Sequence, residues 1–152
     1  MNGTLNMDGN AMPVIDHPAL KRRPRTLEEV AQWSEDLGRI DEFIREFLDE
    51  FYLEPKATQR AAMIAGQPRL SGDIRRDAYL AAVAEHLAFR YGLTVPTWTD
   101  EPSRFLKRPY FPAGLESLKA ILLVESPVAF RRRLIFVGSD PLSRPRRPHE
   151  TR

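Results

Sequence analysis

The sequence contains no cysteine, which excludes disulfides, thiol nucleophiles and cysteine metal ligands together. It also lacks a glycine-rich phosphate loop and a Gly-x-Ser-x-Gly elbow. No apolar run approaches the roughly 18 residues that a membrane-spanning helix requires. The N-terminal residues do not show the basic-then-apolar pattern of a secretory signal. We therefore expect a cytoplasmic protein that is not an enzyme, binds no cofactor and does not span a membrane.

Charge of both signs is present but unevenly placed. Residues 26–54 carry ten acidic side chains against two basic ones, whereas residues 103–152 carry eleven basic against four acidic. The two regions can attract each other within one fold, pair between two copies, or offer separate surfaces to two partners.

Apolar spacing predicts helices from residue 26 onward. Thr26 and Glu29 form a capping-box pattern before a short helix that ends near Gly38. The next helix is predicted by an apolar stripe at i, i+3, i+4, i+7 and i+8 spacing: Ile40, Phe43, Ile44, Phe47, Leu48, Phe51 and Tyr52. Such a stripe is normally core, although its three phenylalanines also suit helix-mediated dimerisation.

The second half continues the helical pattern with proline-rich interruptions. Pro55 is expected to open a third helix that Gly66 ends, and a long alanine-rich helix is expected over 73–91. Extended breaks are expected at 95–98 and 109–112, around a single capped turn over 99–106. Two further helices are expected over 115–124 and 126–133, with Ser126 as N-cap and Pro127 as first helical residue. Residues 134–137 suit a short strand or an extended edge.

These elements predict an all-α fold: a compact multi-helix domain with extended Pro/aromatic connections and disordered N- and C-terminal tails. We expect the domain to span residues 26–137. Residues 1–25, which end in a broken basic run, are expected to be a disordered arm, and residues 138–152 a disordered Pro/Arg-rich tail.

Three consecutive arginines, Arg131, Arg132 and Arg133, lie between two apolar groups near the end of this domain. An ordered arginine cluster can present guanidinium groups in fixed geometry to carboxylates or phosphates. Successive helical residues point about 100° apart, so the three cannot serve one contact. At least one is therefore expected to be structural, for example by pairing with the acids of residues 41–50.

Two alternatives to a protein-binding surface have some support in the sequence. The C-terminal arginine cluster, together with the basic and aromatic residues interleaved between 98 and 111, can contact phosphate and stack on bases, which suits a DNA-binding transcriptional regulator. An enzyme with Asp73, Asp77 and His86 as metal ligands is the weaker alternative, because His86 has no second histidine one turn away.

The second half of the sequence contains a distinctive series of short motifs: Asp77, Ala84-Glu-His-Leu87, Gly92-Leu93, Pro96-x-Trp98, Phe105-Leu106, Pro109-x-Phe111, Leu118 with Ala120, and Glu125-Ser-Pro-x-Ala-Phe-Arg-Arg-Arg133-x-Ile-Phe136. This pattern resembles a family of short bacterial helical proteins that is associated with toxin–antitoxin-like gene pairs. The resemblance implies a protein partner, the toxin-like product of such a pair, and assigns no catalytic residue. The N-terminal arm and the Pro/Arg-rich tail depart from it.

The leading hypothesis is a non-enzymatic interaction module, an antitoxin-like member of such a pair. Its predicted partner-binding residues are Trp98 and Phe111 as aromatic anchors and Arg108, Arg131, Arg132 and Arg133 as charge partners.

Overall fold

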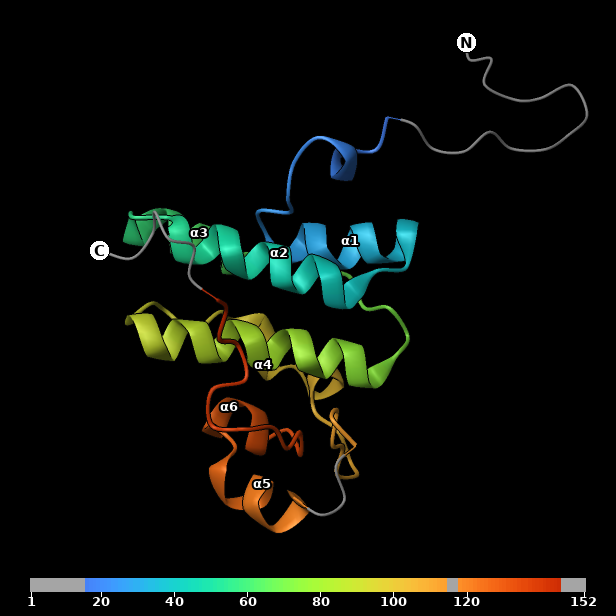
Figure 1. The fold of residues 1–152 in the computed structure, drawn as a ribbon, viewed down its shortest axis with the longest axis vertical. Helices are drawn as coiled ribbons and strands as arrows, with labels where there is room; N and C mark the ends of the chain where they lie inside the picture. Colours follow the sequence, from blue (N-terminus) through green and yellow to red (C-terminus); the bar gives the residue numbers. More distant parts are fainter. Residues whose placement is uncertain (1–15, 115–117, 146–152) are drawn as a thin grey trace, which may run out of the picture.

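The computed structural model describes residues 16–114 and 118–145, and in that part the regular elements are all helical (Figure 1). Among the described residues, six α-helices and three 3-10 turns follow in the order η1 (Pro18–Leu20), α1 (Leu27–Leu37), α2 (Ile40–Leu53), α3 (Ala57–Ala65), α4 (Ile74–Tyr91), η2 (Thr97–Asp100), η3 (Pro102–Arg104), α5 (Lys119–Glu125) and α6 (Val128–Arg131). The predicted all-α class, with extended proline-rich connections, is confirmed.

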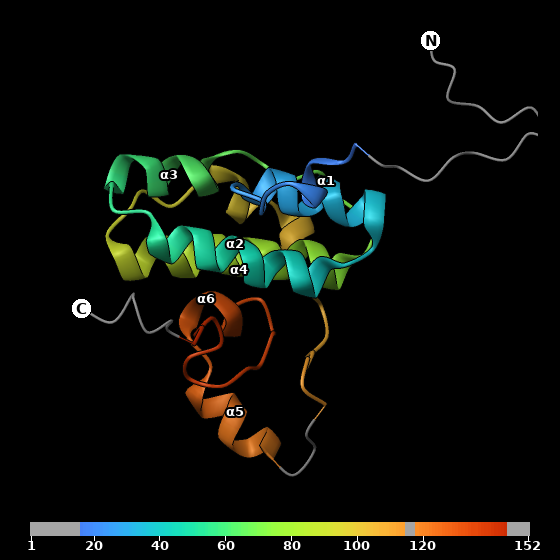
Figure 2. The ribbon, with the colours of Figure 1, turned by 45° about the horizontal axis from the view of Figure 1, so that its top comes forward.

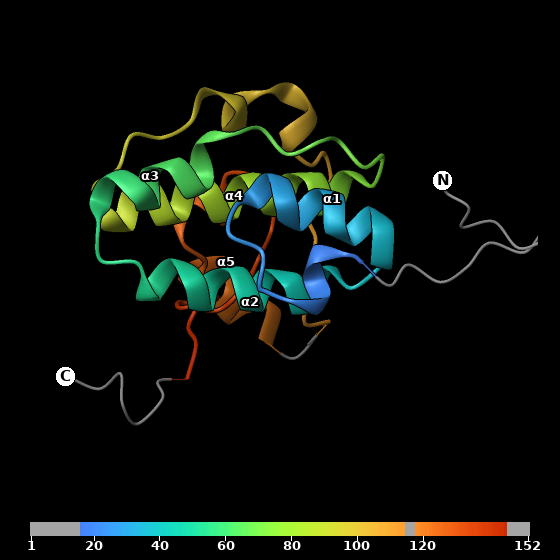
Figure 3. The same cartoon turned by 90° about the horizontal axis from the view of Figure 1, so that it is seen from above.

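Helix α4 is the centre of the fold, between the α1–α3 layer and the C-terminal helices (Figures 1 and 3). It contacts α3, α6, η2 and η3. Five successive residues, 80–84, are fully buried. Since successive residues point about 100° apart, five in a row cover the whole circumference. Over these five residues α4 is buried all round, and its small alanine side chains let neighbouring elements pack closely against it.

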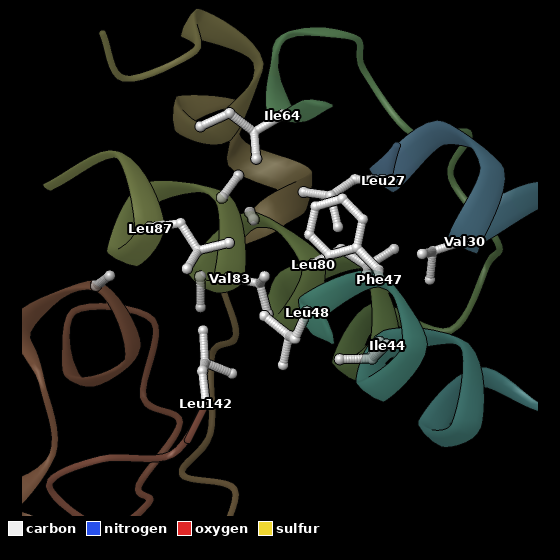
Figure 4. Close-up of a cluster of buried hydrophobic side chains, with 14 of the residues drawn as sticks. Leu27, Val30, Ile44, Phe47, Leu48, Ile64, Leu80, Val83, Leu87 and Leu142 are labelled. Atoms are coloured by element: carbon white, nitrogen blue, oxygen red, sulfur yellow. The ribbon is translucent and has the colours of Figure 1, made fainter. Parts of the chain in front are cut away.

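The apolar stripe of α2 forms the other half of the core, as predicted. Phe43, Ile44, Phe47, Leu48 and Phe51 are all buried, and Figure 4 shows three of these with side chains of α1, α3 and α4.

The turn between α1 and α2 is made at Gly38. This residue has a φ of 73°, in the left-handed region that glycine enters without strain. The turn brings the ring of Trp33 edge-on to that of Phe43, with centroids 5.6 Å apart.

Of the two hydrogen bonds in the predicted capping box at the start of α1, the one from the Glu29 N–H to the Thr26 side chain is present. The Thr26 hydroxyl accepts a hydrogen bond from the Glu29 N–H at 3.0 Å. The Glu29 carboxylate accepts from the Arg25 N–H and pairs with Arg22. The Arg22 guanidinium is the main reason that the pKa of Glu29 is below its usual value.

We expect Thr26→Ala to lower the free energy of unfolding by about 1 kcal/mol, because one N-terminal amide of α1 loses its acceptor. Thr26→Ser, which keeps the hydroxyl, should stay within about half of that loss. Urea unfolding followed by circular dichroism measures both. Equal losses in the two variants would show that the hydroxyl does not cap the helix.

The expected domain limits at 26 and 137 are wrong for the residues described beyond them. His17 is buried and its Nε2 lies 2.9 Å from Asp36 Oδ2. Leu142 is also buried, and its carbonyl accepts from the Tyr52 hydroxyl at 2.8 Å. A single buried side chain such as His17 or Leu142 produces no repeating apolar pattern, so the sequence did not indicate these contacts. Residues 1–15 and 146–152 lie outside the described residues.

Two helix starts and two connections differ from expectation. The third helix begins at Ala57 rather than Pro55, and α5 begins at Lys119, although residues 115–117 lie outside the described part. In the extended break expected over 95–98, Pro96 is extended but η2 begins at Thr97. The single turn expected over 99–106 is instead the end of η2 followed by η3.

The helix expected over 126–133 is reduced to α6. Ser126 does not cap it: the Ser126 hydroxyl donates to Leu122 O at 2.6 Å and so bonds back to α5. Leu134 ends the segment with a φ of 64°, which turns the chain out of the helix. Ile135 then forms one parallel bridge with Tyr110. The extended edge expected at 134–137 therefore begins at Ile135, one residue later than expected.

No helix in the described part of the chain is long and apolar enough to cross a membrane.

Candidate functional site

Arg133 is fully buried and forms part of the core rather than a surface. Its guanidinium donates to Glu85 Oε1 at 2.6 Å, to the Ala129 carbonyl at 2.7 Å and to the Thr99 carbonyl at 2.7 Å. These bonds tie α6 and the η2 turn to α4. Burial lowers the pKa of Arg133, and the bond to Glu85 opposes that change. A buried guanidinium that donates to three groups of its own chain is not available to a partner.

Arg132 is exposed but is also used within the fold. Its guanidinium donates to Glu85 Oε1 at 2.9 Å and to Asp100 Oδ1 at 3.1 Å. The guanidinium carbons of Arg132 and Arg133 both lie over the Phe105 ring, at 5.0 and 4.6 Å from its centroid. The predicted structural pairing therefore occurs, but with Glu85 and Asp100 instead of the acids of residues 41–50.

Arg131 points the other way, toward α5. Its Nη1 donates to the Ser126 carbonyl at 3.0 Å and the Val124 carbonyl at 3.4 Å. A basic side chain at a helix C-terminus is favourable because it lies next to unpaired carbonyls. Within the described residues Arg131 forms no ion pair with a carboxylate. Of the three arginines, Arg131 is therefore the one that keeps an uncompensated, exposed charge.

The predicted aromatic anchors differ in accessibility. Trp98 is buried at 5 % exposure, its Nε1 donates to the Ile64 carbonyl, and the Arg104 guanidinium covers its ring. The prediction that Trp98 is a surface anchor is therefore wrong. Phe111 is partly exposed and stacks on Phe136 with centroids 5.2 Å apart.

Arg108 is exposed, and it forms no ion pair with a carboxylate of the described residues. The six predicted residues thus do not form one face. Arg133 and Trp98 are interior, Arg132 is paired, and Arg108, Phe111 and Arg131 remain accessible.

Helix α5 presents a surface that the sequence analysis did not identify. Of its residues only Leu122 is buried. The apolar side chains around it are 38–77 % exposed: Leu118, Ile121, Leu123, Val124 and, at the start of α6, Val128. We call these five residues the α5 ridge. The described part of the chain has eleven exposed large hydrophobic side chains, and five fall in this stretch of eleven residues. The exposed apolar surface is therefore concentrated here.

The position of α5 explains the exposure. In two views it lies at one end of the molecule, beyond α6 and away from α1–α3 (Figures 1 and 2). Its links to the rest include the buried Leu122 side chain and the Ser126 hydroxyl, which also accepts from the Val137 N–H at 2.9 Å. A sequence signal for this surface did exist: residues 118–124 are apolar on every side of the helix, more than one buried face requires.

The suggested metal ligands Asp73, Asp77 and His86 do not meet. Asp73 and Asp77 are used at the start of α4, as N-cap and as acceptor from Ser71. His86 lies nine residues beyond Asp77, about 13 Å along the helix, against the Phe130 ring. Burial lowers the pKa of His86. The described residues contain no group of three or more potential metal-ligating side chains.

Comparisons with known proteins give no relative: no family model, no curated protein and no solved structure matches this chain.

Proposed function

We propose that this protein is a non-enzymatic protein-interaction module whose contact surface is the α5 ridge. The observation that carries the proposal is the concentration of exposed aliphatic side chains on one small helix. Contiguous exposed apolar patches are uncommon on proteins that act alone, and they are typical of binding surfaces. Phe111 and Arg131, both in the originally predicted set, adjoin this helix: the Lys119 ammonium lies 5.1 Å from the Phe111 centroid, and Arg131 binds the Val124 carbonyl.

The charge distribution favours a protein over DNA as the partner. Two of the arginines available for phosphate contacts, Arg132 and Arg133, donate to Glu85 within the fold. Aliphatic side chains such as Ile121 and Val124 contribute binding free energy when they contact other apolar groups, but not when they contact the charged phosphates of DNA. The resemblance to toxin–antitoxin-like proteins supports a partner encoded beside this chain, so the product of the neighbouring reading frame is the first candidate.

Replacing Ile121 and Val124 by serine should weaken partner binding about 10- to 100-fold, because each side chain is already partly buried and gains on binding about half of the roughly 1.5–3 kcal/mol of full burial. The change removes apolar surface without altering charge. Affinity capture from host-cell extract with quantitative mass spectrometry identifies the partner, and titration of the purified partner measures the loss.

The matched control is Leu20→Ser with Leu53→Ser, which removes two exposed aliphatic side chains, 64 % and 45 % accessible, from η1 and α2. It should bind like the unmodified protein. A partner that is retained at full strength by the Ile121/Val124 variant, with both variants folded by circular dichroism, would refute the proposed surface.

A further inference from the structure

A hollow of about 360 Å³ lies between the N-terminal ends of α2 and α4, beside the segment that contains Tyr110. We call it the α2–α4 hollow. Its wall includes Ile40, Asp41, Arg75, Arg76, Tyr79 and Tyr110. Small-molecule sites begin at roughly 300 Å³ and combine an apolar lining with a few polar groups that orient the ligand. The α2–α4 hollow has this composition, at the lower end of the size range.

The polar groups of this wall are not used within the described part of the fold. The side chains of Asp41 and Arg76 and the hydroxyls of Tyr79 and Tyr110 form no hydrogen bond or ion pair with a described residue. Both tyrosine side chains are nevertheless partly buried and pack against the core. Polar groups in such positions normally bond to protein, to water or to a ligand.

The hollow beside α3 provides a contrast. It is larger, about 430 Å³, but its charged groups are used within the fold. Glu50 pairs with Arg23 and Arg25, and the Glu54 carboxylate accepts from the Lys56 N–H. The unused polar groups, rather than size alone, therefore distinguish the α2–α4 hollow.

The groups around the α2–α4 hollow lie close to one another. The Arg75 guanidinium carbon is 4.4 Å from the centroid of the Tyr110 ring, a contact that positions the guanidinium while its N–H groups donate to no described residue. Burial, with smaller contributions from the nearby Asp41 and Tyr110, raises the pKa of Tyr79 to about 12. The Tyr79 hydroxyl is therefore a protonated donor at neutral pH, close to both residues.

The four charged side chains of the wall are balanced. Asp41 and Asp73 face Arg75 and Arg76 across one hollow. Asp73 Oδ1 already accepts from the N–H groups of Arg75 and Arg76 as the N-cap of α4. Asp41 is thus the carboxylate available to a ligand, and the two guanidinium groups are the available cations. A ligand that carries both signs of charge fits this wall better than an ion of one sign.

We propose that the α2–α4 hollow binds a free aromatic α-amino acid. The guanidinium groups of Arg75 and Arg76 hold its carboxylate, since a guanidinium fork matches the two oxygens of that group. Asp41 holds its ammonium group, and its ring packs on Ile40 and on the Tyr79 ring. The site is separate from the α5 ridge, whose five residues are not among those that line the hollow.

The test titrates the whole 152-residue chain with L-phenylalanine, 3-phenylpropionate and phenethylamine by isothermal titration calorimetry. The second compound lacks the ammonium group, and the third lacks the carboxylate. We expect L-phenylalanine to bind with a dissociation constant below about 1 mM, as a ligand of this size does in a fitted site. Each analogue should bind at least about tenfold more weakly, because one charged hydrogen-bonding group is missing.

Neutral variants of nearly the same size identify the two ends of the site. Arg76→Gln and Asp41→Asn should each weaken L-phenylalanine about tenfold. Asp41→Asn should leave 3-phenylpropionate unweakened, because that compound has no ammonium group. Arg69→Gln and Glu35→Gln are the matched controls: both residues are exposed and lie outside the wall, and both variants should stay within about twofold. Circular dichroism establishes that all four variants are folded.

Three results would overturn the inference. The first is no saturable binding of L-phenylalanine up to about 10 mM. The second is equal binding of all three compounds, or of L-phenylalanine and 3-phenylpropionate, which would show that the two charges are not read together. The third is equal weakening by the Arg76 variant and the Arg69 control. The Ile121→Ser/Val124→Ser variant should bind L-phenylalanine unchanged, and a loss there would place the amino acid on the α5 ridge. Capture of the partner protein judges the ridge separately, so failure of one proposal leaves the other standing.

Discussion

Arg133→Ala is expected to lower the free energy of unfolding by about 3–5 kcal/mol, because it removes one partner of a buried ion pair. The guanidinium has no exposed surface and satisfies one carboxylate and two carbonyls. Without it, the carbonyls of Thr99 and Ala129 stay buried with no donor in its place, at a cost of about 1–3 kcal/mol for each unpaired group. Urea unfolding monitored by circular dichroism measures the change.

Arg132→Ala is the matched control, since it removes the neighbouring arginine from the same Glu85 carboxylate. Its side chain is 39 % exposed, so solvent screens the pair and the expected loss is at most about 1 kcal/mol. Arg133→Met, which keeps most of the volume, should lie between the two. Equal shifts of the urea midpoint in the two alanine variants would show that burial does not make the Arg133 ion pair more stabilising than the Arg132 ion pair.

The parts of the fold that depend on helical periodicity were predictable from the sequence. The α2 stripe, the long α4 helix and the turn at Gly38 each leave a local pattern: apolar spacing, helix formers or a glycine after the last turn. Contacts between distant residues leave no such pattern. The attachment of His17 to Asp36 and of Leu142 to Tyr52 therefore could not be predicted.

The candidate site was predictable only in part, for the same reason. The sequence indicated that at least one of the three arginines is structural, because consecutive residues on a helix point in different directions. It could not indicate which, since that depends on Glu85, 48 residues away from Arg133 along the chain. The three arginines also do not lie on one helix, because α6 ends at Arg131 and the chain turns away at Leu134. The sequence did not indicate this turn. For the α5 ridge the sequence held a signal, the apolar residues on every side of the helix, but which of them are exposed depends on the packing of Leu122.

Trp98→Ala is expected to cost about 3–5 kcal/mol of folding stability, as truncation of a large buried aromatic side chain usually does. The indole is covered by the Arg104 guanidinium, 4.9 Å from its ring, and Arg104 itself has no exposed surface. Arg104 donates to the Pro68 carbonyl at 2.6 Å. Removing the indole therefore also takes away one wall of a buried cation's site. Thermal unfolding by calorimetry measures the loss.

Trp98→Phe distinguishes a core residue from a binding anchor. It keeps an aromatic ring and removes the Nε1 bond to the Ile64 carbonyl, so stability should fall by about 1 kcal/mol and leave the domain folded. Because Trp98 is interior and the ridge is on α5, binding of the captured partner protein should change by less than about twofold. A folded Trp98→Phe variant that no longer binds would restore Trp98 as a contact residue and remove the ridge as the sole surface. The two variants together therefore decide whether this tryptophan supports the scaffold or touches the partner.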